Sequence, residues 1–519
     1  MTSASRPGGV APKFIAFILL LLISVRLLTL GAYPLGSTTE PRYAEIARKM
    51  LETGNWVTPW FDHGVPFWGK PPLSFWGSAA TMAVLGVNEF AVRLAPFLAA
   101  MGTGALFWAW PRREAQRVTL PLAASVVLFS TVAGFIASAA VMTDMFMALG
   151  TTLCMVSFWR AVNEAKTPWR WVFFIGLAVG LLAKGPVATV ITGLALFIWV
   201  AWAGAWGVVW QRLPWWRGAL LTALLSLPWY LLAEHRTPGF LQYFIVGEHF
   251  QRFLVSGWTG DLYGQGHPVA RGLIWWFGFG GFLPWTLVAL LALGVLWRKP
   301  SAVSQQGQGE PAVALGHSLG RHAKEWQYLV AWTVAPLLFF TSARNILEAY
   351  VLPGLPAFAL LATLLVFAAA DRAPWMSRLW LLGLLCPLLW VGWLATSTQP
   401  ELRSQRALLR QWDATTPLVY LGSRPLSANF YSHGKAQLAE SPEAMRRWLA
   451  TPTPVTLILQ DTAAPALPAA ALLPWHVVAR HAGFTMLQRG NSSIDVPVGA
   501  TIEAPVSQTS PKIPSKESK

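Results

Sequence analysis

Four basic residues, Lys70, Lys184, Arg252 and Arg344, interrupt or border apolar stretches of the sequence. Lysine and arginine neutralise anions, and arginine can add two parallel hydrogen bonds to a phosphate. We therefore predict an anion-binding site at a membrane boundary, at the depth of a lipid phosphate or pyrophosphate. Lys184 also has a simpler interpretation, as a lysine whose side chain extends from a helix end to the interface.

Acids occur in the same kind of segment, where they could orient or activate a reacting group. Asp144 interrupts the apolar run VMTDMF, in which an unpaired carboxylate is costly, so it is a functional candidate, with helix capping as the alternative. Glu248 and His249 lie within about one helical turn of Arg252, and His249 shares with Arg252 a face suited to gripping a phosphate. A solvated loop is the alternative for this segment.

A polar island over residues 37–76 must position Lys70. We predict within it a helix that begins near Pro41, where a missing N–H costs little, and ends at Gly54. Its apolar residues follow the spacing of one helical face: Tyr43, Ile46, Ala47, Met50 and Leu51. Its polar face holds Glu45, Arg48, Lys49 and Glu52. Such a helix is expected to lie along a membrane surface with its apolar side toward the lipid.

The chain has 519 residues, of which 54% are hydrophobic and 12% are charged, a balance far from that of soluble domains. A helix needs roughly 20 apolar residues to cross the hydrocarbon, and about eleven to thirteen stretches qualify. The sequence therefore predicts an all-α polytopic membrane protein. The approximate spans are 14–33, 89–110, 119–140, 145–163, 170–184, 186–206, 218–233, 271–296, 327–341, 350–370 and 378–397. The first is expected to be an uncleaved anchor.

The net charge of +16 could suggest a nucleic-acid partner, but the basic residues are distributed over alternate loops and form no single patch. They form five clusters: Arg112, Arg113 and Arg117; Lys166 and Arg170; Arg212 and Arg217; Arg298, Lys299, Arg321 and Lys324; Arg372 and Arg378. By the positive-inside rule all five are cytoplasmic. The loops 34–76 and 234–270, the turns at Asp144 and Ser342, and everything after residue 398 are then outside.

Residues 399–491 have a mixed polar and apolar composition, which predicts a small outside α/β domain after a membrane domain over 1–398. Its expected strands are 418–422, 455–460 and 484–489, and its expected helix is 441–450, capped by Ser441. The tail 492–519 is predicted to be disordered and the loop 300–320 to be flexible. Two cysteines within predicted spans are expected to be small apolar fillers: Cys154 and Cys386.

Several motifs resemble those of a known family. EPRYAEIARKMLETGNWVTP, WGKPPLSFW, NEFAVRLAP, MTD, AKGP and EHFQRF are similar to segments of the aminoarabinose lipid A transferases, which belong with the protein O-mannosyltransferases among polyprenyl-phosphate-dependent GT-C glycosyltransferases. The similarity extends over most of residues 10–360. It implies a multi-pass, inverting glycosyltransferase of a bacterial inner membrane that takes a sugar from undecaprenyl phosphate and places it on lipid A at the periplasmic side.

The resemblance also implies roles for individual residues. Lys70 matches the lysine assigned to the donor phosphate, Asp144 matches a family acid, and Glu40 remains from an acidic pair as a second catalytic candidate. Thr39 and Gly69 stand where the family carries Asp and Glu, which suggests a branch that uses a different sugar, such as glucosamine or another amino sugar. The further candidates are Arg252, Lys184 and Arg42 for the donor phosphate, and Tyr43, Glu248, His249, His267, Arg344 and Tyr350 for the rest of the site.

The predicted reaction is a displacement at the anomeric carbon, with the donor phosphate as leaving group. A lipid A phosphate is ionised at neutral pH and needs little help from a base, which fits the loss of an acid at Thr39. The alternatives are transfer to a protein hydroxyl or another envelope glycan, a lipid-linked sugar transporter with polar groups at mid-membrane, and a relative without catalysis. No cofactor is specified; a divalent metal stays open, although Gly69 would remove one of its ligands. The expected partners are the undecaprenyl-phosphate sugar, lipid A and membrane lipids.

Overall fold

A computed structural model describes residues 11–36, 38–111, 116–164, 167–264, 268–298 and 323–489. The chain consists of two compact units, Met1–Trp412 with Arg424–Ala436, and Asp413–Ser423 with Gln437–Lys519. The first unit extends beyond the boundary predicted at residue 398. Some positions with predicted properties lie outside the described residues: Arg112, Arg113, Lys166, His267, Lys299, Arg321 and the ranges 300–320 and 492–519.

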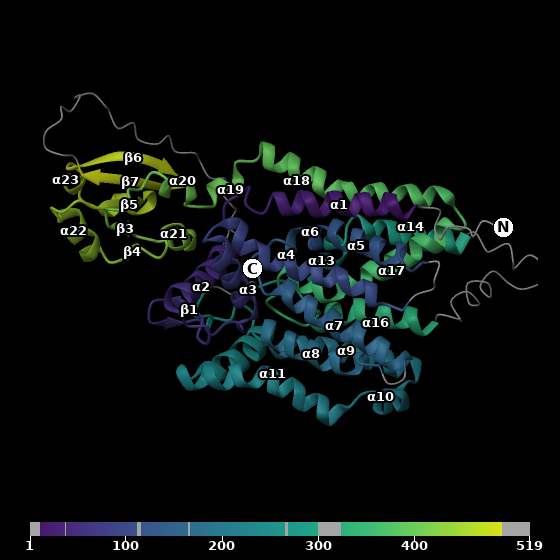
Figure 1. The fold of residues 1–519 in the computed structure, drawn as a ribbon. Coiled ribbons are helices and arrows are strands. Elements are labelled where there is room, and N and C mark those ends of the chain that lie inside the picture. Colours follow the sequence, from purple (N-terminus) through teal and green to yellow (C-terminus); the bar gives the residue numbers. More distant parts are fainter. Residues whose placement is uncertain are drawn as a thin grey trace, which may run out of the picture. The chain divides into compact units, whose positions relative to one another are not determined.

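Helices make up most of the described part of the first unit, as the apolar stretches predict (Figure 1). The earlier helices are α1 (Pro12–Leu28), α2 (Thr39–Thr53), α3 (Leu73–Leu85), α4 (Glu89–Leu106), α5 (Thr119–Ser130), α6 (Val132–Ala137), α7 (Asp144–Asn163), α8 (Trp169–Lys184), α9 (Pro186–Ala203), α10 (Trp206–Arg212) and α11 (Trp215–Arg236). The later ones are η4 (Gln242–Gln251, a π-helix), α12 (Arg252–Leu254), α13 (Leu273–Gly281), α14 (Trp285–Arg298), α16 (Ala323–Phe340), η6 (Glu348–Gly354), α17 (Leu355–Ala370), η7 (Pro374–Leu384), α18 (Leu385–Thr396), α19 (Gln399–Leu402), α20 (Arg406–Leu409) and α21 (Leu426–Tyr431). A short hairpin, β1 (Trp60–Asp62) and β2 (Val65–Pro66), precedes α3.

Among the described residues, five helical segments are long and apolar enough to cross a membrane, and the pair α13 and α14 could form a sixth span. The five are Glu89–Ala109, Asp144–Asn163, Pro186–Ala203, Glu348–Ala370 and Pro374–Thr396. The helices α3 and α5 are apolar but shorter. The chain is therefore a multi-pass membrane protein, and the larger number of spans inferred from the sequence remains a prediction.

Two stretches predicted as single spans are broken. Residues 271–296 contain α13 and α14, which are bent by 85° relative to each other. Pro284 lies at this break, where proline has no N–H to continue the first helix. Residues 119–140 are divided at Thr131, whose hydroxyl accepts a hydrogen bond from the Gly134 N–H and so begins α6.

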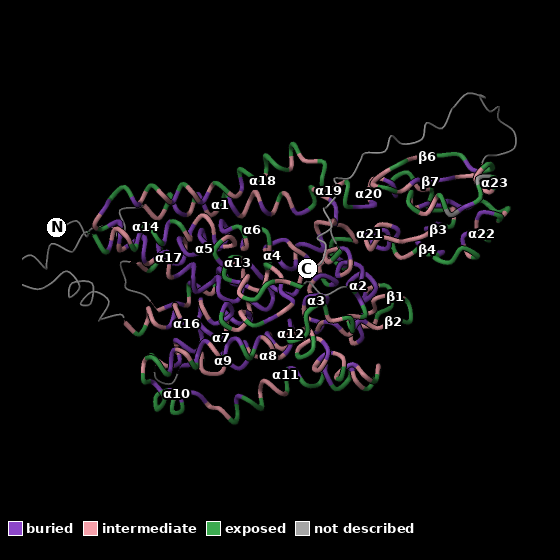
Figure 2. Tube along the Cα trace, turned by 180° about the vertical axis from the view of Figure 1, so that it is seen from behind, coloured by how far each residue is buried: buried purple, intermediate pink, exposed green. Residues whose placement is uncertain are grey.

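The interior of the first unit is formed by α7 and the segment of η6 and α17, whereas α18 lies at its surface (Figure 2). Of the apolar windows in these segments, 78% and 83% are buried, compared with 17% for the window that includes α18. Leu388 and Leu389 of α18 are 67% and 63% exposed within the protein. Such leucines are suited to contact with lipid tails, which are as apolar as the side chains themselves.

The helix predicted in the polar island is present as α2, which ends at Gly54 in a left-handed conformation with φ of 63°. Its predicted position on a membrane surface is wrong, because its apolar face packs within the protein. Tyr43, Ile46 and Met50 join one hydrophobic cluster with Phe75 of α3. The helix is therefore a fixed wall of the first unit.

Three of the four residues on the polar face of α2 are also buried, and only Glu52 is exposed. Glu45, Arg48 and Lys49 are 3%, 5% and 1% exposed. The Arg48 guanidinium donates to Glu45 at 2.7 Å, and the Lys49 ammonium donates to Asp62 at 3.1 Å. Asp62 also accepts a hydrogen bond of 2.6 Å from Arg424, in the segment that carries α21. Each buried charge thus has an opposite partner, as burial of charges requires.

The environment of Asp62 predicts a pH effect on stability. Burial alone raises the pKa of Asp62, but Lys49 and Arg424 lower it overall to about 2. A carboxylate whose pKa is depressed by folding adds stability above its unfolded pKa of about 3.9, and this stability is lost as the pH falls toward the folded value. We expect the difference in melting temperature between wild type and Asp62→Asn to shrink on acidification. Thermal unfolding in detergent at several pH values measures this, with exposed Glu443→Gln as control; a pH-independent difference would contradict the prediction.

The second unit contains a five-stranded mixed sheet with the order β4-β3-β5-β7-β6. Its strands are β3 (Leu418–Leu421), β4 (Ala436–Ala439), β5 (Thr456–Gln460), β6 (Trp475–His481) and β7 (Phe484–Arg489), and its helices are α22 (Pro442–Ala450) and α23 (Ala469–Leu472). β3 pairs in parallel with β5, and β5 pairs antiparallel with β7. The three predicted strands and the predicted helix are confirmed, whereas β4 and β6 were not predicted.

Ser441 begins α22 as predicted, since its hydroxyl accepts a hydrogen bond of 3.2 Å from the Ala444 N–H. Replacing Ser441 by alanine is expected to destabilise the second unit by about 1 kcal/mol, because one N–H of the first turn loses its acceptor. Chemical denaturation followed by tryptophan fluorescence measures the loss. Ser441→Asp should retain the wild-type stability, and an equal loss in both variants would contradict the capping role.

Candidate functional site

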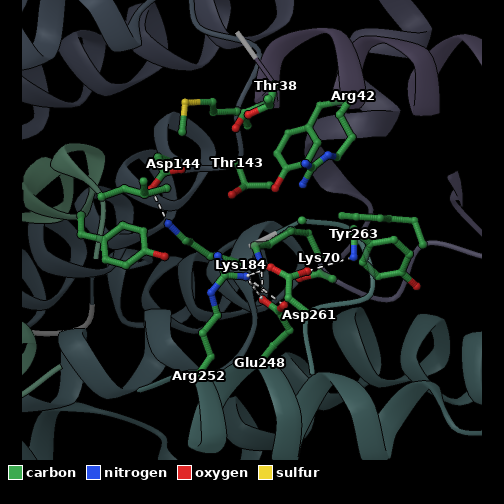
Figure 3. A pocket seen from close by; sticks show the side chains of 18 residues that line it. Thr38, Arg42, Lys70, Thr143, Asp144, Lys184, Glu248, Arg252, Asp261 and Tyr263 are labelled. Atoms are coloured by element: carbon green, nitrogen blue, oxygen red, sulfur yellow. Dashed lines mark hydrogen bonds and ion pairs between the residues drawn. The ribbon is translucent and has the colours of Figure 1, made fainter. Parts of the chain in front are cut away.

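Side chains from distant parts of the first unit line one cavity of about 330 Å³ (Figure 3). One wall is α2, and the turn at Gly69 and Lys70 lies beside it. The rest of the lining comes from the start of α7, the end of α8, the segment η4 to residue 264, and the beginning of η6. The loops and helix ends that the sequence placed on one side of the membrane therefore meet at a single site.

Most residues predicted for the site line this cavity. They are Arg42, Tyr43, Lys70, Asp144, Lys184, Glu248, Arg252 and Tyr350. Both positions that depart from the family pattern, Thr39 and Gly69, line it as well. Four lining polar residues were not predicted: Thr38, Thr143, Asp261 and Tyr263. Asp261 and Tyr263 occupy a polar stretch, GDLYG, whose only sequence signal is its nearness to Arg252.

Asp144 and Lys184 form an ion pair at the cavity wall (Figure 3). Their side chains are 7% and 9% exposed, so the pair is nearly dehydrated. Asp144 is the first residue of α7 and Lys184 the last of α8, and the Lys184 ammonium also lies 4.2 Å from the centre of the Tyr350 ring. Both residues thus line the cavity, as expected of site residues.

Glycines explain how α7 and α8 approach closely enough to bring Asp144 to Lys184. A Cβ on Gly150 would lie 2.7 Å from the backbone nitrogen of Gly180. A Cβ on Gly176 would lie 2.8 Å from the backbone nitrogen of Cys154. Larger side chains would separate the two helices, since these atoms are rigid backbone.

Glu248 connects two of the basic residues. Its carboxylate accepts hydrogen bonds from the Lys70 ammonium at 2.6 Å and from the Arg252 guanidinium at 3.0 Å. Arg252 also donates to Asp261 at 3.2 Å. Burial by itself raises the pKa of Glu248, but the cations of Lys70 and Arg252 outweigh burial and lower it. Glu248 is therefore an ionised counter-ion.

Tyr263 fixes the turn that carries Lys70. Its hydroxyl donates to the Pro66 carbonyl at 2.7 Å and accepts a hydrogen bond of 3.0 Å from the Trp68 N–H. Burial raises the pKa of Tyr263 to about 12, so the hydroxyl stays neutral and can donate. These two bonds hold the backbone on both sides of Phe67 and so limit the movement of Lys70.

Arg42 is the exception among the lining cations. Among the described residues, no hydrogen bond or ion pair is formed by its guanidinium, and its Nε is buried without a partner. In Figure 3 Arg42 projects from α2, on the side of the cavity across from Glu248 and Arg252. A buried polar atom without a partner is costly, so this guanidinium is suited to receive an anion.

The lining has a positive balance and offers no free acid. Its cations are Arg42, Lys70, Lys184 and Arg252, and its carboxylates are Asp144, Glu248 and Asp261, each of them paired with one of these cations. The described part of the chain contains no group of three or more His, Cys, Asp or Glu side chains that could hold a metal. The donor set therefore does not fit a divalent cation, and we derive no step through one.

Three predicted site residues in the described ranges are placed elsewhere. Glu40 accepts two hydrogen bonds from buried Arg93, at 3.2 and 2.9 Å, and one of 3.2 Å from the Val141 N–H. Nδ1 of His249 lies 2.7 Å from the Phe244 carbonyl oxygen; burial lowers the pKa of His249, although backbone hydrogen bonds oppose the shift. Arg344 joins its neighbours through backbone hydrogen bonds. None of the three lines the cavity.

Glu40 is expected to matter for stability. Arg93 is 0% exposed and takes its negative partner from Glu40. Glu40→Ala should destabilise the first unit by about 3 kcal/mol, because it leaves a buried cation with backbone carbonyls and the Tyr33 ring but no negative charge. Glu52→Ala is a matched control, since Glu52 pairs with Arg48 but is 41% exposed, and it should cost less than about 1 kcal/mol. Thermal unfolding measures the loss of stability in each variant. Equal losses in Glu40→Ala and Glu52→Ala would contradict the role of Glu40 as the partner of Arg93.

The chain has sequence relatives among known proteins. Residues 11–244 match the family model of dolichyl-phosphate-mannose-protein mannosyltransferase. The undecaprenyl phosphate-alpha-4-amino-4-deoxy-L-arabinose arabinosyl transferase of Erwinia tasmaniensis is 31% identical over 335 residues, which are 63% of this chain and 54% of that protein. The enzyme of the same name from Aeromonas salmonicida is 31% identical over 368 residues, 66% of this chain and 58% of that protein. The chain thus spans little more than half the length of these curated relatives.

The fold has a match among solved structures. The crystal structure of ArnT from Cupriavidus metallidurans bound to undecaprenyl phosphate superposes with a TM-score of 0.68 and 18% identity, covering 93% of this chain and 99% of that one. The structure of the same protein in the apo state gives a TM-score of 0.69. At this identity the likeness shows a common fold. The chain therefore shares the fold of ArnT, and its sequence is similar to the aminoarabinose transferases over about two thirds of its length.

Proposed function

We propose that the chain is a glycosyltransferase of a bacterial inner membrane that moves a sugar from undecaprenyl phosphate to a phosphate of lipid A. The observation that carries this proposal is the cavity, which gathers four cations at the ends of apolar helices and leaves one of them, Arg42, unpaired among the described residues. The names of the relatives support the donor and an amino sugar such as 4-amino-4-deoxy-L-arabinose. The distribution of basic loops supports a periplasmic cavity and a periplasmic second unit.

In the proposed reaction, an oxygen of the acceptor attacks the anomeric carbon while the bond from that carbon to the donor phosphate oxygen breaks. The sugar is transferred with inversion, and undecaprenyl phosphate leaves. Negative charge increases on the leaving phosphate during this step. Lys70 and Arg252 lie close together through Glu248 and are the cations suited to stabilise that charge.

An acceptor phosphate fits the cavity better than a neutral hydroxyl does. The three lining carboxylates are held by cations, and the lowered pKa of Glu248 makes it a weak base. A phosphate monoester is already ionised at neutral pH and needs no base. Arg42 is available to bind it, and Asp144, which lines the cavity and pairs with Lys184, would orient the amine of the sugar. Glu40 has a positioning role in this scheme, since it anchors the start of α2 to Arg93.

A protein O-glycosyltransferase is the second candidate. The match of residues 11–244 to the protein mannosyltransferase model favours it. Its acceptor would be a serine or threonine hydroxyl, which is un-ionised at neutral pH and needs a general base in the transition state. The paired carboxylates of the cavity are poor bases, and we therefore place this candidate second.

Mass spectrometry of lipid A tests the proposal. Cells that express the chain should contain lipid A with the added mass of one sugar residue per modified phosphate. Cells without the chain, and cells with the Asp144→Asn variant at equal abundance, should lack that mass. Unmodified lipid A together with a glycosylated envelope protein would instead support the second candidate.

A further inference from the structure

Glu248 occupies a position that an anionic ligand of Lys70 and Arg252 would need. Its carboxylate lies 2.6 Å from the Lys70 ammonium and 3.0 and 3.2 Å from Nη1 of Arg252. The Glu248 side chain is 4% exposed, whereas those of Lys70 and Arg252 are 16% and 17% exposed. The carboxylate lines the cavity together with the two cations, so a phosphate that enters the cavity meets all three groups.

The charges of this cluster cancel. Lys70 and Arg252 carry two positive charges, and Glu248 and Asp261 carry two negative ones. A phosphate that enters the cavity meets a neutral group in this arrangement. It gains the attraction of Lys70 and Arg252 free of the opposing charge of Glu248 only by displacing that carboxylate, because the negative charges of the carboxylate and the phosphate repel each other.

The backbone of Glu248 is unusual as well. Gln242–Gln251 form a π-helix, a rare backbone that is found frequently at functional sites. Tyr243, from the start of the same helix, donates to Glu248 at 3.4 Å. Glu248 thus has a long hydrogen bond from Tyr243 and short ones from Lys70 and Arg252. The π-helix that carries it is separate from the helices that carry Asp144 and Lys184.

We propose that Glu248 is an internal competitor of the donor phosphate for Lys70 and Arg252, and that it speeds the release of undecaprenyl phosphate after each transfer. This inference rests on the proposed function, since it concerns the leaving group of that reaction. Binding of the donor displaces the carboxylate from the cations, and return of the carboxylate displaces the product phosphate. Glu248 acts here through Lys70 and Arg252, so it is a positioning residue.

The test compares binding of undecaprenyl phosphate by the purified full chain in detergent. Glu248→Gln keeps the shape and removes the charge, and we expect its dissociation constant to be about ten-fold lower than that of wild type. Asp261→Asn removes one of the two carboxylates that pair with Arg252 and should lower the dissociation constant roughly three-fold. Glu52→Gln removes a carboxylate from another arginine outside the cavity and should bind as wild type does.

Turnover gives an independent readout. Glu248→Gln should keep its first turnover and lose steady-state rate, with inhibition by added undecaprenyl phosphate at lower concentration than in wild type. A purely structural role would lower the first turnover and the steady state together.

Each outcome bears on one claim. Weaker or unchanged binding by Glu248→Gln would overturn the inference, since it would show that the carboxylate helps to hold the cations for the phosphate. If Glu248→Gln fails to fold, Asp261→Asn tests the inference instead. Tighter binding of undecaprenyl phosphate by Asp261→Asn would support it, and weaker or unchanged binding would overturn it. If wild type itself does not bind undecaprenyl phosphate, the proposed function fails, and the inference fails with it.

Discussion

Lys70→Ala is expected to lower kcat/KM for sugar transfer about 10²- to 10³-fold, the usual effect of removing one group that stabilises transition-state charge. Lys70 lies in the cavity with its ammonium within 2.6 Å of Glu248, and its turn is fixed by Tyr263. The variant should fold normally, because Glu248 keeps Arg252 as its counter-ion. Transfer rates and the melting temperature, measured on the same purified sample, separate an effect on catalysis from an effect on folding.

Two further variants sharpen this prediction. Lys70→Arg keeps the charge and should retain more activity than Lys70→Ala. Exposed Lys435 lies outside the cavity lining, and Lys435→Ala should have wild-type activity. Wild-type transfer by Lys70→Ala would remove Lys70 from the donor site.

Asp144→Ala is expected to affect both stability and activity. The pair with Lys184 is nearly buried, so the variant leaves an uncompensated ammonium and should lose about 3–5 kcal/mol of unfolding free energy. Transfer should fall at least about 10²-fold, since the cavity loses the carboxylate proposed to orient the sugar amine. Thermal unfolding and the transfer assay measure the two losses.

A double variant separates structure from chemistry at this pair. Asp144→Asn combined with Lys184→Met removes both charges, and replacing a whole buried pair by neutral groups is often nearly neutral for stability. The double variant should therefore regain most of the stability lost in Asp144→Ala and remain inactive. Recovery of both stability and transfer would show that the pair is structural.

Many residues of the site were predictable from the sequence because polar groups beside apolar stretches are rare and costly. Asp144 and Lys184 stood out for that reason, and so did Lys70 in its turn. Their partners were not predictable. Lys70 is 178 residues from Glu248, and Lys184 is 40 residues from Asp144, and such pairings depend on how the helices pack.

The polar face of α2 shows why other predictions failed. Glu45, Arg48 and Lys49 follow the spacing of a solvated face, and nothing local to α2 reveals that Asp62 and Arg424 will cover it. Glu40 was predicted to be catalytic because it remains from an acidic pair of the resembling family, but it forms an ion pair with buried Arg93. In each case a partner distant in the sequence determines whether a charged residue lies at the surface, stabilises the fold or belongs to the site.

Transfer by the purified chain tests the central claim most directly. The chain is reconstituted in lipid vesicles with undecaprenyl-phosphate-linked 4-amino-4-deoxy-L-arabinose and lipid A, and the lipids are analysed by mass spectrometry. We predict that wild type forms glycosylated lipid A and undecaprenyl phosphate in equal amounts, and that Lys70→Ala forms far less of both. The absence of glycosylated lipid A with wild type, or equal amounts with wild type and Lys70→Ala, would contradict the account.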